Sequence, residues 1–104
     1  MVTLGVQEDL MPMEFALMQN YPNPFNPSTQ IMYSLPKTSS VKIVIYDMLG
    51  SKVRTLYSGV QDAGYKNVLW NATNEQGDPV SAGMYIYTIE AGSFFASKKM
   101  ILLK

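Results

Sequence analysis

Near its middle the chain reads Val41-Lys42-Ile43-Val44-Ile45-Tyr46-Asp47-Met48-Leu49-Gly50-Ser51. Successive side chains of a β-strand point to opposite faces, so Val41, Ile43 and Ile45 would share one face. The run ends at Asp47, and Gly50 is free to adopt the positive φ that a tight turn requires. These residues predict a strand whose isoleucine face lies in the core, followed by a hairpin.

The same pattern continues on both sides of this hairpin. Short apolar runs alternate with Gly, Pro, Asn and Asp at intervals of about eight to twelve residues, which is typical of an all-β sandwich. Val53 and Leu56 lie three positions apart, so a bulge or a strand end near Thr55 is needed to place both on one face. We expect about seven strands, over residues 15–19, 30–35, 41–47, 52–58, 64–71, 84–91 and 94–103.

Trp70 is the only tryptophan, and it follows Lys66 and Val68 on one parity of its predicted strand. A single indole buries up to about 250 Å², so we predict that Trp70 fills the core. A surface platform for stacking a sugar is the alternative. A turn is expected around Gly77, and the small residues that end at Gly83 lead into the next strand.

A proline-rich segment precedes the second strand and reads Tyr21-Pro22-Asn23-Pro24-Phe25-Asn26-Pro27. Its prolines exclude a helix, cannot donate to a central sheet ladder, and push the preceding residues into extended geometry. The asparagine side chains can bond their own backbone in tight turns. The segment is therefore a stiff loop, a lead-in strap for the sandwich, and we expect Tyr21 and Phe25 to anchor it.

The last predicted strand is apolar on both parities at Met100-Ile101-Leu102-Leu103, and Lys98, Lys99 and Lys104 flank this run. Lysines in such positions oppose edge-to-edge pairing. One interpretation is a central or well-covered strand. The other is a chain segment that a partner recognises, with the apolar side chains and ammonium groups as its address.

Composition restricts the possible functions of these 104 residues. The chain has neither cysteine nor histidine, which excludes a disulfide, a thiol nucleophile and an imidazole base or metal ligand. Lys plus Arg and Asp plus Glu number eight each, so the net charge gives no reason to expect nucleic acid as a partner. The longest apolar runs fall far short of the roughly 20 residues that span a bilayer.

The acidic and hydroxyl side chains predict no catalytic site. Most carboxylates fall at predicted turns, and a glycosidase would need two of them across a cleft that a small sandwich rarely has. Serine without a suitable base is inert. Residues 71–78 offer oxygen atoms to calcium, but turn chemistry explains them more simply. We expect neither an enzyme nor a cofactor nor a metal.

Residues 13–104 resemble, in order and spacing, the C-terminal sorting domains carried by cargo of the bacterial type IX secretion system. Lys66 stands where the family has His, and Asn71-Ala72 where it has Asp-Gly. A related immunoglobulin-like domain occurs in flagellar hook-capping proteins and is similar in the strand and turn motifs. The motifs that carry the resemblance are the opening from Phe15 to Pro27, Ile31, Tyr33, Leu35-Pro36, Ile45 to Gly50, Val53, Leu56, Ala63-Gly64, Trp70, Gly77, Val80, Ser81 to Tyr87 with Gly83 and Tyr85, and Lys99-Met100-x-Leu-Leu-Lys104.

This resemblance implies an immunoglobulin-like antiparallel sandwich over residues 15–104, with 1–14 as a linker or frayed tail. It implies a non-catalytic sorting signal that directs an upstream cargo on the same chain through the periplasm and the outer-membrane translocon to the cell surface. The outer-membrane machinery, the cargo domain and a surface sortase are the implied partners. The alternative is a passive spacer or a carbohydrate-binding module. The expected recognition residues are Lys98, Lys99, Met100, Leu102, Leu103 and Lys104.

Overall fold

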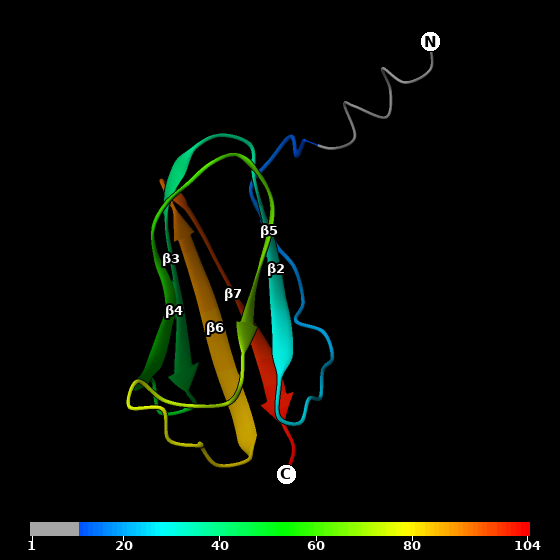
Figure 1. Ribbon diagram of the computed structural model, residues 1–104, viewed down its shortest axis with the longest axis vertical. Helices are drawn as coiled ribbons and strands as arrows, with labels where there is room; N and C mark the ends of the chain where they lie inside the picture. Colours follow the sequence, from blue (N-terminus) through cyan, green and yellow to red (C-terminus); the bar gives the residue numbers. More distant parts are fainter. Residues whose placement is uncertain (1–10) are drawn as a thin grey trace.

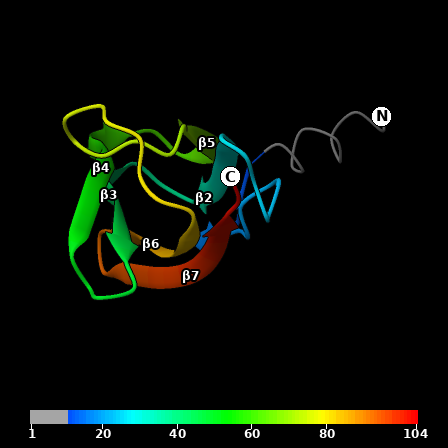
Figure 2. The ribbon, with the colours of Figure 1, turned by 90° about the horizontal axis from the view of Figure 1, so that it is seen from below.

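The computed structural model describes residues 11–104, in which seven strands form two antiparallel sheets (Figure 1). The sheets lie on opposite sides of a common interior (Figure 2). Every predicted strand is present, although the first is shortened to two residues. The smaller sheet has the order β1-β2-β5, with β1 (Ala16–Leu17), β2 (Thr29–Leu35) and β5 (Gly64–Trp70). The larger sheet has the order β4-β3-β6-β7, with β3 (Ser39–Asp47), β4 (Lys52–Gln61), β6 (Gly83–Ala91) and β7 (Phe94–Leu102).

The hydrophobic core fills the space between the two sheets. Val41, Ile43 and Ile45 are at most 1% exposed, which confirms the predicted core face of β3. Trp70 is also 1% exposed, and burial of its indole confirms the prediction that it fills the core. The largest fully buried side chains are Trp70, Tyr33, Tyr87 and Phe25.

The bulge expected near Thr55 is present. Ile43 pairs with Tyr57 and Val44 pairs with Thr55, so Leu56 is an extra residue in β4. A second register shift lies two pairs further along, between Ile45 and Tyr46. Together the two irregularities let Val53 and Leu56 both pack against the core, which an uninterrupted strand could not do.

Two turns, which begin at Asp47 and at Asn74, share the same hydrogen-bond pattern. The Asp47 Oδ1 atom accepts hydrogen bonds from the amides of Leu49 and Ser51, and the Gly50 amide donates to the Asp47 carbonyl at 3.0 Å. Asn74 repeats this geometry with Gln76, Gly77 and Asp78. Both glycines have φ near +88°, a conformation that side chains with a Cβ disfavour. The hairpin predicted at Gly50 is therefore confirmed.

Candidate functional site

The segment Gln19–Pro27, called the strap below, lies along the outer edge of β7. The Phe25 amide donates to the Ile101 carbonyl at 3.0 Å, and the Leu103 amide donates to the Phe25 carbonyl at 2.9 Å. These two bonds form a short parallel bridge between Phe25 and Leu102. The strap thus occupies part of the edge that β7 would otherwise present as the last strand of its sheet.

Two side chains of the strap extend this contact. The Asn23 Oδ1 atom accepts the Ile101 amide at 2.9 Å. The Gln19 Nε2 atom donates to the Lys99 carbonyl at 2.8 Å. Together with the bridge, these bonds satisfy backbone groups of β7 from Lys99 to Leu103. Edge strands are protected in this way from pairing with other chains.

Phe25 anchors the strap in the core, as predicted. Its side chain is 1% exposed, and its ring lies 5.8 Å from that of Trp70 between centroids. The aromatic pair adds to the apolar area that Phe25 removes from water. The strap is therefore held by one buried ring as well as by hydrogen bonds.

Tyr21 is not an anchor, and this part of the prediction was wrong. Its side chain is 77% exposed. The backbone of Tyr21 pairs with that of Gln30 through two hydrogen bonds of 2.9 Å. Directly opposite residues of an antiparallel pair share a face, and Gln30 lies on the solvent face of β2. Pairing therefore directs the Tyr21 ring outward.

The base of the strap is tied to the opposite sheet by Tyr87. The Tyr87 hydroxyl donates to the Met18 carbonyl and accepts the Asn20 amide, both at 2.7 Å. Burial raises the pKa of Tyr87 to about 12. Asn20 is 2% exposed, and its Nδ2 donates to the Thr29 hydroxyl at 2.9 Å, which in turn donates to the Pro22 carbonyl at 2.8 Å.

Sequence reasoning did not assign a role to this buried network. Asn20 and Tyr87 both lie inside motifs that carry the family resemblance, so the signal was present in those motifs. Their partnership could not be seen, because Asn20 and Tyr87 are 67 residues apart. The network fixes the position from which the strap crosses to β7.

β7 separates the expected recognition residues into two groups. Met100 and Leu102 are at most 1% exposed and belong to the core. Lys98 lies on the same parity and is half-buried. The solvent side carries exposed Lys99, Leu103 and Lys104, together with Ile101, which is 37% exposed and was not among the expected residues.

The expectation of a central strand is not met, since β7 has only one neighbouring strand in its sheet. It is covered instead by the strap, so the expectation of a covered strand holds for the part from Lys99 to Leu103. In the folded domain, Met100 and Leu102 shape the strand from the core side. Only the outward side chains are placed for contact with a partner.

The remaining motif residues have structural positions. Tyr85 packs edge-on against Trp70 with ring centroids 5.4 Å apart, and burial raises the pKa of its hydroxyl. That hydroxyl donates to the Ser81 carbonyl at 2.6 Å. Trp70 donates its Nε1 hydrogen to the Thr73 carbonyl at 2.9 Å. The alternative of Trp70 as a surface platform for sugar is overturned by its burial.

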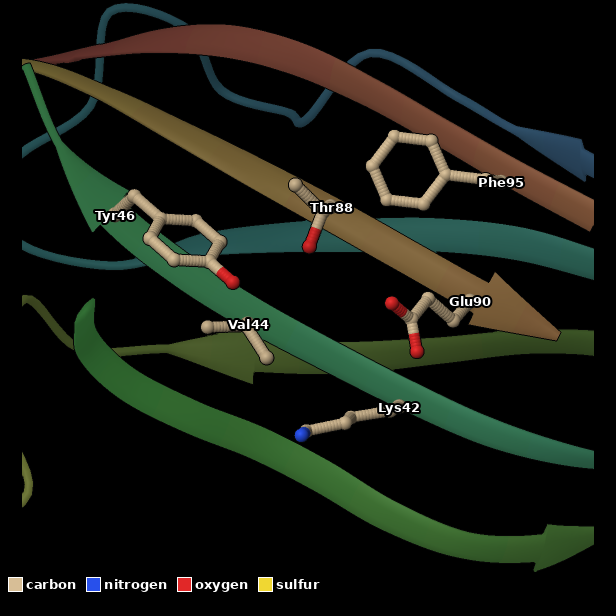
Figure 3. A pocket seen from close by; sticks show the side chains of 6 residues that line it. All are labelled: Lys42, Val44, Tyr46, Thr88, Glu90 and Phe95. Carbon is tan, nitrogen blue, oxygen red and sulfur yellow. The ribbon is translucent and has the colours of Figure 1, made fainter. Parts of the chain in front are cut away.

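A second surface feature lies on the solvent face of the larger sheet. It is a shallow hollow of about 210 Å³, with Phe95 and Tyr46 at its rim and Val44 beneath it (Figure 3). Val44 is only 3% exposed although it points away from the core, because the surrounding side chains cover it. The lining residues are Lys42, Val44, Tyr46, Thr88, Glu90 and Phe95.

The polar loop that could offer oxygen atoms to calcium is used for turns and contacts. The Asn74 Oδ1 atom accepts two backbone amides, and a Glu75 carboxylate oxygen accepts the Thr55 amide at 2.8 Å. Across residues 11–104, acidic side chains do not gather into a group of three that could hold a metal ion. The same range contains no helix that is long and apolar enough to cross a membrane.

Solved structures share this fold. The chain is similar to dimeric latent PorU from Porphyromonas gingivalis, with 19% identity over 86% of this chain and 9% of that chain and a TM-score of 0.67. It is similar to PorZ, described as an essential bacterial surface component of the type IX secretion system of the same organism, with 21% identity, coverages of 86% and 11%, and a TM-score of 0.54. The alkylpurine DNA glycosylase AlkC from Pseudomonas fluorescens shares 12% identity, coverages of 88% and 31%, and a TM-score of 0.56. At these identities the likeness concerns the fold.

The sequence comparison defines the family. No curated protein matches the chain. The model of the FlgD Ig-like domain matches residues 26–93, which is more than half of the chain and contains β2 to β6. The strap up to Phe25 and all of β7 lie outside the matched range. The immunoglobulin-like sandwich and this match together show that the chain belongs to the FlgD Ig-like domain family.

Proposed function

We propose that this domain is a non-catalytic sorting signal of the type IX secretion system, which directs an attached upstream cargo through the outer membrane to the cell surface. The observation that carries the proposal is that the strap is hydrogen-bonded to the edge of β7. These are the two distinctive ends of the resemblance to sorting domains, and they meet at the contact between Asn23 and Ile101, 78 residues apart in sequence.

The comparisons support this proposal at the level of the fold. PorZ, which shares the fold, is described as a surface component of the same secretion system. The family match begins after Phe25 and ends before β7, so the two segments that form the proposed signal lie outside the matched range. Recognition would use the exposed groups of this surface, chiefly Ile101, Leu103, Lys99 and Lys104. A surface sortase is a further expected partner after translocation.

An export assay tests the proposal. A reporter fused to residues 15–104 should reach the surface of a bacterium that has a type IX system, whereas the unfused reporter should remain in the periplasm. Replacing both Lys99 and Lys104 by alanine should lower surface display several-fold, because these exposed ammonium groups belong to the proposed address. Exposed substitutions usually change stability by no more than about 0.5 kcal/mol. Lys98 is left intact, since it is half-buried and its loss would mix stability with recognition.

The matched control replaces two exposed lysines elsewhere, Lys37 and Lys52, by alanine. That variant should be displayed like the wild type. Normal display of the Lys99 and Lys104 variant would show that these two lysines are not needed for recognition. Export that is unchanged when the whole domain is deleted would contradict the sorting function itself, and the passive spacer would take its place.

The hollow on the larger sheet favours a second candidate, a carbohydrate-contacting domain. Phe95 is 60% exposed, and Tyr46 lies at the other side of the hollow (Figure 3). Aromatic faces bind the apolar faces of sugars, and Lys42, Thr88 and Glu90 supply polar groups. Binding to a glycan array that is lost in Phe95→Ala would support this candidate. Absence of binding by the wild type would exclude it.

A further inference from the structure

We propose that the edge of β7 from Lys99 to Leu103 is a docking site for an extended peptide strand of the export machinery. The strap is the internal occupant of this site, and it must be displaced before the partner can pair with β7. The identity of the partner rests on the proposed function. The site itself rests on four hydrogen bonds and one buried ring.

The edge of β7 already accepts an extended segment. Phe25 pairs with β7 through its own amide and carbonyl, in the geometry of a parallel ladder. Peptides that add a strand to a sheet edge use the same main-chain bonds for affinity. The strap therefore shows where a partner strand would lie and in which register it would begin.

The strap itself makes few of the main-chain hydrogen bonds that a regular strand would make with β7. Only Phe25 contributes backbone groups to β7, while Gln19 and Asn23 reach it through their side chains. Pro22 and Pro24 have no amide hydrogen to donate. A regular strand would replace the two side-chain bonds by main-chain bonds. It could also continue along β7, since alternate residues of a strand direct their backbone groups to the same edge.

The surroundings of the strap restrict the side chains that a partner strand must carry. Phe25 fills a place beside Trp70 at 1% exposure, so a strand that displaces it must bring a large apolar residue to the same position. Lys99 belongs to this edge and Lys104 directly follows Leu103; both are exposed, and their positive charge favours acidic residues in the flanks of the partner. The expected partner is thus an extended segment with one large apolar residue between acidic ones.

A disulfide lock tests the displacement of the strap. Asn26 and Leu103 are both exposed and lie one residue beyond the bridged pair Phe25 and Leu102. The chain contains no cysteine, so the double variant Asn26→Cys, Leu103→Cys has a single possible intramolecular disulfide, and the monomer is used for binding. Oxidation would hold the strap on β7, and reduction would free it. The single-cysteine variants serve as controls for folding.

The probe is a labelled synthetic peptide with the sequence of residues 19–27 in which both Pro22 and Pro24 are replaced by valine. We expect it to bind the reduced double variant at least tenfold more tightly than the oxidised one. A peptide that also has Phe25 replaced by alanine should bind at least tenfold more weakly. Equal binding to the oxidised and reduced protein, or binding to neither, would overturn the proposal.

A second variant tests the same point without a lock. Gln19→Ala with Asn23→Ala removes two strap bonds and leaves Phe25 in place, so the probe should bind several-fold faster. Asn67→Ala, an exposed amide on β5, is the matched control and should leave the rate unchanged. Unchanged binding rates in the Gln19 and Asn23 variant would contradict the displacement step.

The export assay separates this proposal from the proposed function. The periplasm is oxidising, so the lock should form there. We expect the double-cysteine fusion to be displayed at least several-fold less than the Leu103→Cys fusion, which carries the same change at the proposed recognition surface but cannot form the lock. If domain deletion stops export while the locked fusion is exported normally, the docking site is wrong and the sorting function stands. If deletion has no effect, the sorting function fails.

Discussion

At the scale of single residues, Ala72 shows how the chain departs from the sorting domains that it resembles without losing the fold. It stands where the sorting-domain family has glycine, and its φ is +63°. This conformation costs an alanine roughly 1–2 kcal/mol. Burial of the methyl group offsets about 0.8 kcal/mol of this cost. The turn is retained, and the Val80 amide bonds the Ala72 carbonyl at 3.0 Å.

Tyr87 leads to a prediction about pH. Its pKa is raised from 10.0 to about 12 by burial, so the folded state favours the neutral hydroxyl. The resulting stability should be complete below pH 10 and decline as the pH rises towards 12. Burial also raises the pKa values of Tyr33 and Tyr85, which act in the same direction. Urea midpoints measured between pH 8 and pH 11.5 should show this decline.

The control for this prediction is Tyr87→Phe. It removes the partner of the Asn20 amide and the Met18 carbonyl, which should cost about 1–3 kcal/mol at pH 8. The variant should then lose stability less steeply above pH 10. An equally steep decline would show that Tyr87 does not contribute to the pH dependence.

At the scale of elements, the strap and β7 depend on each other. β7 gives the strap a ladder to pair with, and the strap covers a sheet edge that would otherwise face solvent. The strap is proline-rich, so it offers few amide hydrogens of its own to a further strand. The strap therefore ends the larger sheet at β7, because a further strand could not pair regularly with the outer side of the strap.

Phe25→Ala should separate anchoring of the strap from formation of the sheets. Loss of the buried ring beside Trp70 should lower the free energy of unfolding by about 3–5 kcal/mol, as large-to-small core changes do. The far-ultraviolet circular dichroism of the folded protein should remain that of a β-protein. Hydrogen exchange should become faster at the amides of Ile101 and Leu103, which bond the strap.

Tyr21→Ala is the matched control within the strap, because this ring is 77% exposed. Its effect on stability should stay within about 0.5 kcal/mol. If Phe25→Ala behaved like Tyr21→Ala in unfolding and in hydrogen exchange, the strap would not be anchored through Phe25.

At the scale of the whole molecule, three of the four edge strands are protected, each in a different way. β7 has the strap, and β4 has two bulges and the bond from its Thr55 amide to Glu75. β5 carries Lys66 on the same parity as buried Trp70, so a charge points toward the core side of an edge strand. Inward-pointing charges of this kind oppose the addition of another strand. The molecule is thus built against uncontrolled edge pairing.

Lys66→Val should weaken the protection of β5. We expect a concentration-dependent increase in self-association, measured by sedimentation velocity, because the core-side face of this edge strand would then carry no charge to oppose pairing. Lys42→Val is the matched control on central strand β3, whose edges are already paired. Self-association of both variants alike would point to added surface hydrophobicity, and a monomeric Lys66 variant would contradict the role of Lys66.

The sequence alone was sufficient for the number and positions of the strands, the core face of β3, the burial of Trp70 and the hairpin at Gly50. These features follow from the period of apolar residues and from turn chemistry, which act over a few neighbouring positions. It also located the strap and the unusual end of β7 as separate features. Resemblance to sorting domains gave both the same proposed role.

Only the tertiary structure decided how those features combine. It placed Met100 and Leu102 in the core and Ile101 outside, because a strand that is apolar on both parities has no pattern to select its buried face. It selected Phe25 over Tyr21 as the anchor through the pairing of Tyr21 with Gln30. It joined the strap to β7 across 78 residues, since contacts between distant segments depend on the packing of the whole sandwich.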